Sequence, residues 1–410
     1  KRIYMGGEEI MKRKLKKISL LLLVITVFFA STNICSYALN EEILLHVNFD
    51  ENVQDLSGNE NDGSVKGEVE YVDGIKGKAI HIVNSNGSTS QVANQYVDFG
   101  KNIRFNNNDF AISFWYKSDN GVSNGGALIS NKDFDSGSNK GFNIGNFDTG
   151  LRVNFTPENS ERYDVGNFGN SIRVNYTGQG CNRDDIYGLS ANDDNWHYIV
   201  VNFDRDGYIE TFVDNKVMGR TDISNEINKS IDVSNFVVGA DGYFKNGLND
   251  AYVDELNVFS RLMDVEEIES QYNTTYLQYV VNEADKFYQE VLKNIKYDKE
   301  KANNVQYGYV PDPDQTLNDK TGICFDYASL TCAMLRSQGI PTKLEVGYVG
   351  EVYHAWISCY VDETGWIDNI IEFDGKDWSL LDPTLGANNK SKDVKKYIGD
   401  GSKYIVKYTY

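Results

Sequence analysis

The stretch TGICFDYASLTCAMLRSQGIP, residues 321–341, decides the fold of the C-terminal part of the chain. Its apolar residues recur at spacings of three and four, which predicts a helix from Ile323 to Gln338. The glycine and proline that follow end this helix, because neither continues it well. Gly322 permits an unusual backbone entry, and Cys324 falls in the first turn, where the helix dipole and free amides stabilise a thiolate.

Two neighbouring cysteines are interpreted as core thiols. Cys332 is eight residues further along the predicted helix, about 80° around and about 12 Å up from Cys324, so the two cannot share a site. Cys359 lies on the opposite face of the predicted strand 352–361 from His354. Cys324 is therefore the candidate nucleophile of this half.

A nucleophilic thiol needs a base within reach and a third group that fixes the tautomer of the base. His354 is the one histidine after residue 274, and Asp382 ends the next predicted strand. Cys324 and His354 are therefore a candidate nucleophile and base, and Asp382 is a candidate for the third group. The alternative is a buried cysteine, an unrelated histidine and an aspartate that only caps a turn.

Upstream, residues 43–260 alternate apolar and polar side chains in short runs separated by Gly, Asn, Asp and Ser, which predicts an antiparallel β-sandwich. One hairpin is expected between residues 197–203 and 208–214. At Asp264 the period changes to that of a helix, with Glu267 at capping-box spacing. We expect a sandwich over residues 39–262, a connecting helix over 263–273, and a second domain over 274–410 whose first helix runs from Leu277 to Ile295.

The N-terminal residues 1–38 are predicted to be a secretory signal peptide. A basic run precedes an apolar stretch of 13 residues, 18–30, and Ser36-Tyr37-Ala38 forms a small-x-small cleavage site. The apolar stretch is shorter than the about 18 residues expected of a membrane anchor. Met11 is the preferred start, which makes residues 1–10 pre-start sequence. These features predict a protein that is secreted, extracellular or associated with the cell surface.

Composition excludes several classes of partner. The chain of 410 residues has 40 Lys and Arg against 60 Asp and Glu, a net charge of −20, which disfavours nucleic acids, polyanions and anionic membranes. The four cysteines after residue 38 are too few for a disulfide framework. The chain contains neither an HExxH nor a CxxC motif, so a metallohydrolase is disfavoured.

The N-terminal half carries a set of phrases in a fixed order. They are Phe49-Asp50, Asp55-Leu56-Ser57-Gly58-Asn59, Asn61-Asp62-Gly63, Gly74-Ile75-Lys76-Gly77-Lys78-Ala79, Phe114-Trp115, Trp196-His197 and Val253-Asp254-Glu255-Leu256. This set resembles the laminin-G-like, concanavalin A-like jelly-roll domains of secreted proteins. The resemblance implies a lectin-like fold with a glycan or glycoprotein ligand. Trp115 and Trp196 are interpreted as core, so no sugar-contacting residue is named.

The same resemblance implies a structural calcium ion held by loop oxygens. The candidate ligands are Asp55, Asn59, Asp62 and Asp254, because calcium takes six to eight oxygens. The alternative is that these residues form turns and that Asp254 is bonded to backbone amides. His46, His81 and His197 show no ligand-pair spacing, so no zinc site is expected.

The C-terminal half also carries ordered phrases. They are residues 321–328, Met334-Leu335-Arg336-Ser337-Gln338-Gly339-Ile340-Pro341, Gly347-Tyr348, His354-Ala355-Trp356 and Leu381-Asp382-Pro383-Thr384. They resemble the transglutaminase-like superfamily of Cys-His-Asp enzymes. The resemblance implies an α+β, papain-like fold in which Cys324 attacks a carboxamide, His354 shuttles the proton and Asp382 orients the imidazole. No cofactor is expected for this catalysis.

Some details of this site stay open. The backbone N–H of Cys324 is one candidate oxyanion donor, and Gln315 is either the second donor or a solvated loop residue. Tyr353 and Trp356 either wall the acyl groove or are buried against the helix.

The predicted chain is therefore multidomain, an all-β jelly-roll sandwich followed by a transglutaminase-like domain. The leading functional hypothesis is a secreted thiol-dependent acyl-transfer enzyme, either a cysteine peptidase or amidase or a protein transglutaminase, which a lectin-like domain targets to glycans. The alternative is a non-catalytic carbohydrate-binding adhesin with a silent scaffold. The motifs do not separate hydrolysis from transamidation, and hydrolysis is slightly preferred because water is always present.

Overall fold

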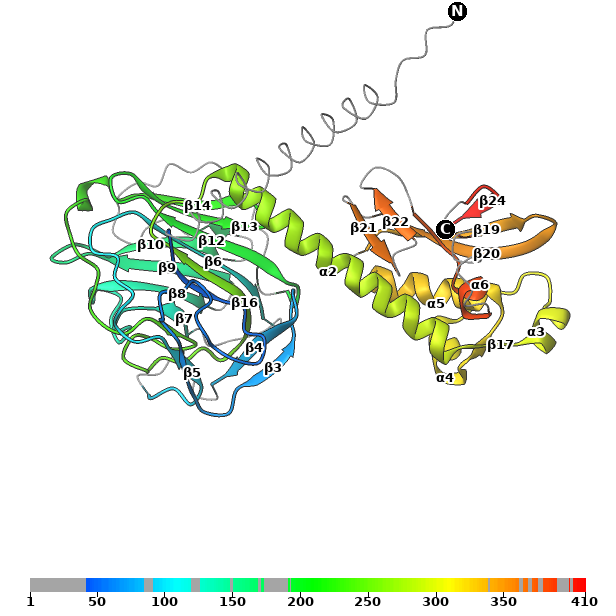
Figure 1. Ribbon diagram of the computed structural model, residues 1–410, viewed down its shortest axis with the longest axis horizontal. Coiled ribbons are helices and arrows are strands. Elements are labelled where there is room, and N and C mark those ends of the chain that lie inside the picture. Colours follow the sequence, from blue (N-terminus) through cyan, green and yellow to red (C-terminus); the bar gives the residue numbers. More distant parts are fainter. Residues whose placement is uncertain are drawn as a thin grey trace, which may run out of the picture. The chain divides into compact units, whose positions relative to one another are not determined.

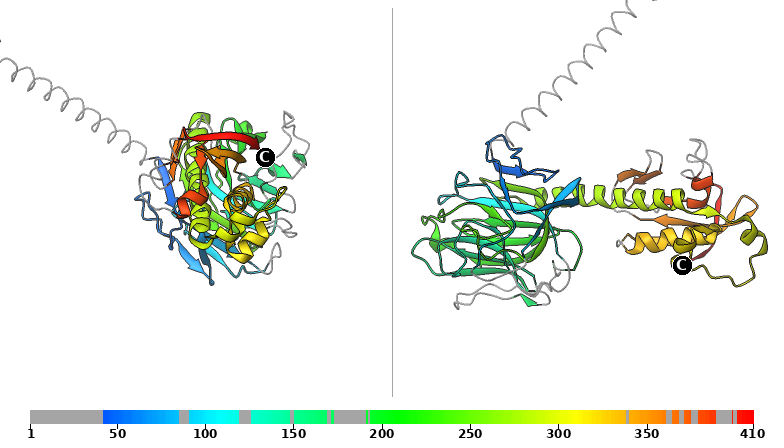
Figure 2. Two further views of the ribbon diagram at one scale, coloured as in Figure 1. Left: turned by 90° about the vertical axis from the view of Figure 1, so that its right-hand side faces the viewer. Right: turned by 90° about the horizontal axis from the view of Figure 1, so that it is seen from below.

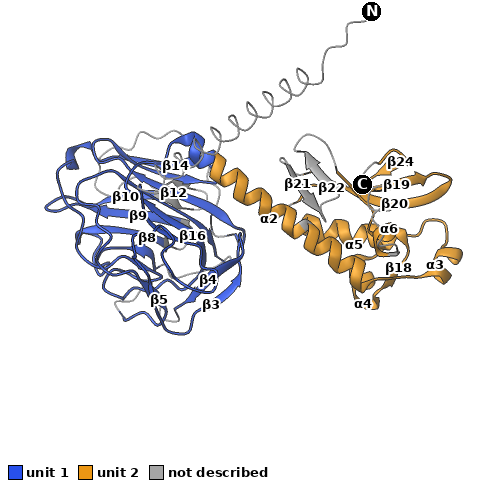
Figure 3. Cartoon of the chain, in the orientation of Figure 1, with its two compact units in different colours: residues 1–269 blue, residues 270–410 orange. Residues whose placement is uncertain are grey.

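The computed structural model describes residues 42–84, 91–118, 126–147, 150–168, 171–172, 191, 193–337, 340–360, 364–367, 371–374, 379–388, 398 and 401–410. The predicted signal peptide and Cys181 lie outside the described residues. The chain forms two compact units, residues 1–269 and residues 270–410 (Figure 3). No helix in the described part of the chain is long and apolar enough to cross a membrane.

The first unit is a sandwich of two antiparallel sheets, which confirms the predicted all-β fold (Figures 1 and 2). One sheet has the order β14-β13-β12-β6-β16-β4-β3, and β1 also pairs with β16. Its strands are β1 (Ile43–Val47), β3 (Glu70–Asp73), β4 (Lys78–Val83), β6 (Phe110–Lys117), β12 (His197–Phe203), β13 (Tyr208–Val213), β14 (Lys216–Asp222) and β16 (Asp250–Phe259). The predicted hairpin is β12 and β13, with Phe203 opposite Ile209.

The other sheet has the order β11-β10-β9-β8-β7-β15-β5-β2. Its strands are β2 (Ser64–Lys66), β5 (Tyr96–Asp98), β7 (Gly126–Ser130), β8 (Gly141–Phe147), β9 (Gly150–Thr156), β10 (Tyr163–Phe168), β11 (Ser171–Ile172) and β15 (Val237–Val238). A short 3-10 helix, η1 (Ser224–Glu226), follows β14.

The sandwich core lies where the inward side chains of the two sheets meet. Phe203 stacks on Phe110 with ring centroids 4.1 Å apart, and Phe142 and Phe155 of the other sheet lie 5.5 and 5.7 Å from Phe203. Trp115 is buried in the same unit, as the sequence predicted. Aromatic packing of this kind contributes beyond the apolar area that it buries.

Helix α2 (Val265–Asn294) differs from the sequence expectation of two helices with a break near residues 273–275. These residues, Asn-Thr-Thr, are only moderately poor helix formers, and no glycine or proline interrupts the run, so the helix continues through them. Its start is capped as predicted, since the Asp264 carboxylate accepts the Glu267 N–H at 2.7 Å. In a capping box the Glu267 side chain would accept the N–H of Asp264, but here it accepts hydrogen bonds from Arg261.

The second unit packs helix α5 (Cys324–Ser337) on a four-stranded sheet of order β23-β20-β19-β24. The core between them contains Ala328 and Cys332 from the helix, and Ala355 and Cys359 from β20. The remaining elements are β17 (Lys296–Tyr297), α3 (Lys299–Asn304), α4 (Pro313–Asp319), β18 (Thr321–Gly322), β19 (Thr342–Val349), β20 (Val352–Cys359), β21 (Thr364–Ile367), β22 (Ile371–Asp374), β23 (Ser379–Leu381), α6 (Pro383–Asn388) and β24 (Tyr404–Thr409).

Cys332 and Cys359 are buried thiols, as the sequence predicted. Burial raises the pKa of Cys332, and it raises the pKa of Cys359 to about 12. A buried thiol in apolar surroundings is a poor nucleophile, because the reactive form is the thiolate. Among the cysteines that the structure describes, only Cys324 is partly exposed.

Replacement of Phe203 by alanine tests the packing of the sandwich. We expect F203A to lower the free energy of unfolding by about 3–5 kcal/mol, because it deletes a fully buried ring and leaves a cavity. Urea unfolding of the full chain measures the loss. The control V92A changes a side chain that is 66% exposed and should stay within about 0.5 kcal/mol of the parent. Equal losses for the two variants would contradict the assigned core.

Candidate active site

Cys324 is the first residue of α5, as the sequence predicted to within a turn. The carboxylate of Asp326, which is fully buried, accepts the N–H of Ile323 at 2.8 Å and so fixes the start of the helix. The first backbone amides of a helix have no partner within the helix and point toward any group at its start. The thiol therefore sits where backbone donors and the positive end of the helix dipole are available.

Asp326 also anchors the segment that precedes the helix. Its carboxylate pairs with the Lys301 ammonium at 2.8 Å and accepts a hydrogen bond from the Tyr309 hydroxyl. These contacts connect α3 and the loop after it to the helix that carries Cys324. Asp326 belongs to the motif of residues 321–328, but its role could not be predicted from that motif. Its partners Tyr309 and Lys301 lie 17 and 25 residues upstream.

Gly322 is required for space rather than for an unusual backbone conformation. Its φ is not positive, which differs from the sequence expectation. A β-carbon at this position would lie 2.6 Å from Cβ of Asp326, closer than real β-carbons approach. Glycine thus allows the chain to pass directly against the carboxylate that caps the helix.

His354 lies on β20, is hydrogen-bonded to Asp382 and interacts electrostatically with Cys324. Its Nε2 is 2.7 Å from Oδ2 of Asp382, and its ring also interacts with the Cys324 thiol. With Nε2 engaged by the carboxylate, Nδ1 is the nitrogen left for the thiol. Burial lowers the pKa of His354, but the hydrogen bonds to Asp382 and Cys324 outweigh burial and raise it to about 10. The structure thus brings the three predicted residues together, and their catalytic roles stay predictions.

Asp382 is fully buried and has a partner for each of its oxygens. Oδ1 accepts the N–H of Leu385 at 2.9 Å and so caps α6, while Oδ2 accepts from His354 and from the Tyr404 hydroxyl, the latter at 2.8 Å. The main-chain oxygen accepts from the Tyr288 hydroxyl at 3.1 Å. Asp382 therefore both caps α6 and contacts His354. From the sequence, the cap was expected as the alternative to the contact with His354.

The aromatic residues around the thiol differ in part from expectation. Trp356 is fully buried and donates its indole N–H to Glu345 at 2.9 Å, so it is a core residue rather than a groove wall. Tyr353 is 55% exposed. Burial and the nearby Cys324 raise the pKa of Tyr297, and burial, neighbouring tyrosines and Cys324 raise that of Tyr353. Tyr297, which sequence reasoning missed, lies opposite Gly322 in the pairing of β17 with β18, two residues before Cys324.

Gln315 does not contact Cys324 in the described structure. It lies on the exposed surface of α4, where its amide donates to the Asp319 carboxylate at 3.3 Å. The position of Gln315 therefore fits the alternative in which it is a solvated residue. No residue is assigned as the second oxyanion donor.

The predicted calcium ligands have hydrogen-bond partners within the sandwich. Asp55 accepts the N–H groups of His46, Ser57 and Asn61 at 2.8–3.1 Å, and Asp62 accepts the N–H of Asp55. The Asn59 amide donates to main-chain oxygens of β1. These contacts match the alternative in which the residues form turns. The sequence alone does not distinguish calcium ligands from turn residues, because the same residue types serve in both.

Asp254 is fully buried and accepts the N–H groups of Lys76 and Glu255 at 3.1 and 2.7 Å. Burial raises the pKa of this carboxyl to about 8. Asp254 is therefore satisfied by backbone amides and takes up a proton near neutral pH, which also corresponds to the alternative.

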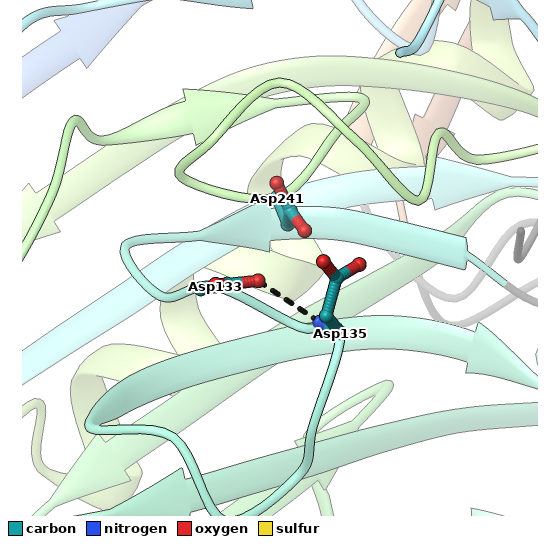
Figure 4. A group of neighbouring side chains, drawn as sticks. All are labelled: Asp133, Asp135 and Asp241. Atoms are coloured by element: carbon teal, nitrogen blue, oxygen red, sulfur yellow. Dashed lines mark hydrogen bonds between the residues drawn. The ribbon is translucent and has the colours of Figure 1, made fainter. Parts of the chain in front are cut away.

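Elsewhere in the sandwich, Asp133, Asp135 and Asp241 bring their carboxylates within 4.8 Å of one another (Figure 4). The buried Asp241 accepts four hydrogen bonds, from the N–H groups of residues 134, 243 and 245 and from the amide of residue 246. Asp135 pairs with Lys245 at 2.7 Å. These partners account for the position of the cluster, which ties two neighbouring loops together.

Comparisons with known proteins identify the same two domains. The family model of the concanavalin A-like lectin/glucanases superfamily matches residues 90–269. That of the transglutaminase-like superfamily matches residues 266–369. The chain therefore carries a concanavalin A-like domain followed by a transglutaminase-like domain, in the order that its sequence motifs predict.

Individual relatives are more distant. The UPF0252 protein MJ1282 of Methanocaldococcus jannaschii is 34% identical over 86 residues, 18% of this chain and 24% of that protein, so the match spans about a quarter of the relative. The binding domain of Paraclostridial Mosquitocidal Protein 1 is similar with a TM-score of 0.45 and 17% identity, covering 82% of this chain and 68% of that one. The binding domain of botulinum neurotoxin serotype D gives 0.42 and 14%, covering 63% and 53%. Scores this low support no inference about function.

The pKa of His354 predicts how stability depends on pH. Because folding raises this pKa from its ordinary 6.5 to about 10, the stabilisation is fully present below pH 6.5 and is lost as the pH rises through about 10. We expect the free energy of unfolding of the parent to fall over this range relative to H354Q. Urea unfolding of both proteins at several pH values measures the difference. Parallel pH curves for the two proteins would show that the ring is not held as an imidazolium.

Proposed function

We propose that the chain is a thiol-dependent acyl-transfer enzyme that acts on peptide or carboxamide bonds. The observation that carries the proposal is the position of His354, whose Nε2 lies 2.7 Å from the Asp382 carboxylate and whose ring interacts electrostatically with Cys324. A nucleophile, a base and a group that orients the base are the parts that such chemistry needs. The match to the transglutaminase-like superfamily supports the same assignment.

The geometry supports a defined sequence of steps. With a pKa of about 10, His354 holds a proton at neutral pH, so its imidazolium stabilises negative charge on the Cys324 sulfur during the attack. The sulfur attacks the carbonyl carbon of the substrate, and the oxyanion that forms accepts the free N–H at the start of α5. The imidazolium then gives its proton to the departing amine or ammonia, which leaves a thioester on Cys324.

The thioester passes its acyl group to an acceptor, and the same base takes the proton of that acceptor. Water gives hydrolysis, whereas a lysine side chain gives a cross-link. The motif residues do not separate these two outcomes, so the slight preference for hydrolysis rests on the abundance of water.

The sandwich supplies a targeting function in this proposal. Concanavalin A-like domains support binding to a glycan or glycoprotein, which would hold the enzyme near its protein or peptide substrate. The predicted signal peptide supports a location outside the cell or on its surface. The four predicted calcium ligands have no role in catalysis in this scheme, and a structural calcium ion stays a prediction.

The second candidate is a non-catalytic adhesin, and the partial exposure of Cys324 provides the test that separates the two. An enzyme should react with iodoacetamide at Cys324 near neutral pH faster than a free thiol does, because its imidazolium stabilises a thiolate. A rate no faster than that of free cysteine would favour the adhesin.

Replacement of Cys324 tests the nucleophile. We expect C324A to abolish covalent chemistry while the fold stays intact, since the side chain is small and partly exposed. The assay is mass spectrometry of a glutamine-containing protein incubated with enzyme and excess labelled amine, together with circular dichroism of the variant. Cleavage or deamidation supports hydrolysis, and incorporated amine without cleavage supports transamidation. Turnover retained in C324A would remove this residue from the role.

Replacement of Asp382 by asparagine separates its two contacts. Asparagine caps helices well, so D382N should keep the start of α6, while it loses the stabilisation that the charge gives to the imidazolium of His354. It no longer carries the charge that stabilises the imidazolium, so the rate should fall by about 10²- to 10⁴-fold. The matched control D314N changes an exposed carboxylate on α4 and should keep the parent rate. Equal rates for D382N and the parent would show that Asp382 serves only as a cap.

A further inference from the structure

Tyr404, the first residue of β24, reaches the carboxylate behind His354. Its hydroxyl lies 2.8 Å from Oδ2 of Asp382, the same oxygen that lies 2.7 Å from Nε2 of His354. Two donors from two different strands thus converge on one buried oxygen. Hydrogen bonds to a charged group are stronger than those between neutral groups.

The ring of Tyr404 is held in place by its neighbours. It packs edge to face on Trp356, with centroids 5.0 Å apart and an interplanar angle of 73°. Trp356 is in turn fixed by its hydrogen bond to Glu345, which also accepts the Ser358 hydroxyl at 2.6 Å. The backbone of Tyr404 pairs with Val349 of β19. The hydroxyl is therefore placed by the sheet that carries His354.

The contacts of Asp382 show what this placement does. The N–H of Leu385 holds Oδ1, and the Tyr404 hydroxyl holds Oδ2, so the two donors together set the plane of the carboxylate. The Tyr288 hydroxyl contacts the main-chain oxygen of Asp382. His354 and Tyr404 both contact Oδ2.

We propose that Tyr404 is a positioning residue, which holds Oδ2 of Asp382 in line with Nε2 of His354. The inference rests on the proposed function and extends the machinery from the three motif residues to β24. Without the hydroxyl, the carboxylate is free to turn about the hydrogen bond at Oδ1. The imidazolium of His354 then loses part of its stabilisation, while the groups that border the thiol are unchanged.

The variant Y404F tests this role, because it removes the hydroxyl and keeps the ring on Trp356. We expect kcat to fall about tenfold with little change in KM, as for the loss of one hydrogen bond to a charged group. We also expect the pKa of His354, measured by NMR titration of its ring, to fall below the parent value. The matched control Y408F changes a tyrosine of the same strand that is 58% exposed, and it should retain both parent values.

The outcomes separate this inference from the proposed function. Fast alkylation of Cys324 in the parent, with unchanged kcat and His354 titration in Y404F, would overturn the role of Tyr404 and leave the enzyme assignment intact. Slow alkylation in the parent would count against the proposed function, and the His354 titration of Y404F would still decide whether Tyr404 positions the pair. A lowered melting temperature with an unchanged titration would show that the hydroxyl is only structural.

Discussion

The buried charge of Asp382 is the constraint on which the candidate active site depends. Removing a carboxylate from water costs several kcal/mol unless donors replace the lost hydration. The donors come from three separate elements, namely Leu385 of α6, Tyr404 of β24 and His354 of β20. Satisfying one carboxylate therefore requires these elements to meet, and the same contacts orient the imidazole toward Cys324.

A second buried carboxylate acts in the same way on the nucleophile. Asp326 holds the start of α5 through Ile323 and attaches the preceding segment through Lys301 and Tyr309. Two buried carboxylates thus fix the two halves of the site, one beneath the thiol and one behind the histidine. A group held from two sides loses little entropy when it reacts, which is one general source of catalytic power.

Local patterns in the sequence predicted the elements well. The alternation in β12 and β13, the capping of α2 by Asp264, and the spacing in α5 all reflect interactions between near neighbours. Cys324, His354 and Asp382 could be predicted as a set because the motifs that contain them occur in the order of a known superfamily. Periodicity alone would not have selected these three residues. Tyr404 and Tyr297 were missed, since their contacts depend on tertiary placement and a tyrosine carries no local signal among 27. The calcium site stays a prediction, because turn residues and calcium ligands share their chemistry.

The assignment of Cys324 as the nucleophile is tested most directly by a pre-steady-state reaction of the full chain with a small activated ester, which needs no knowledge of the natural substrate. We expect a burst of leaving group equal to the amount of reduced Cys324. We also expect an acyl group on that residue, which mass spectrometry detects in the acid-quenched protein and hydroxylamine removes. A linear release without a burst, and an unmodified Cys324 shown to be reduced, would contradict the assignment of this residue as the nucleophile.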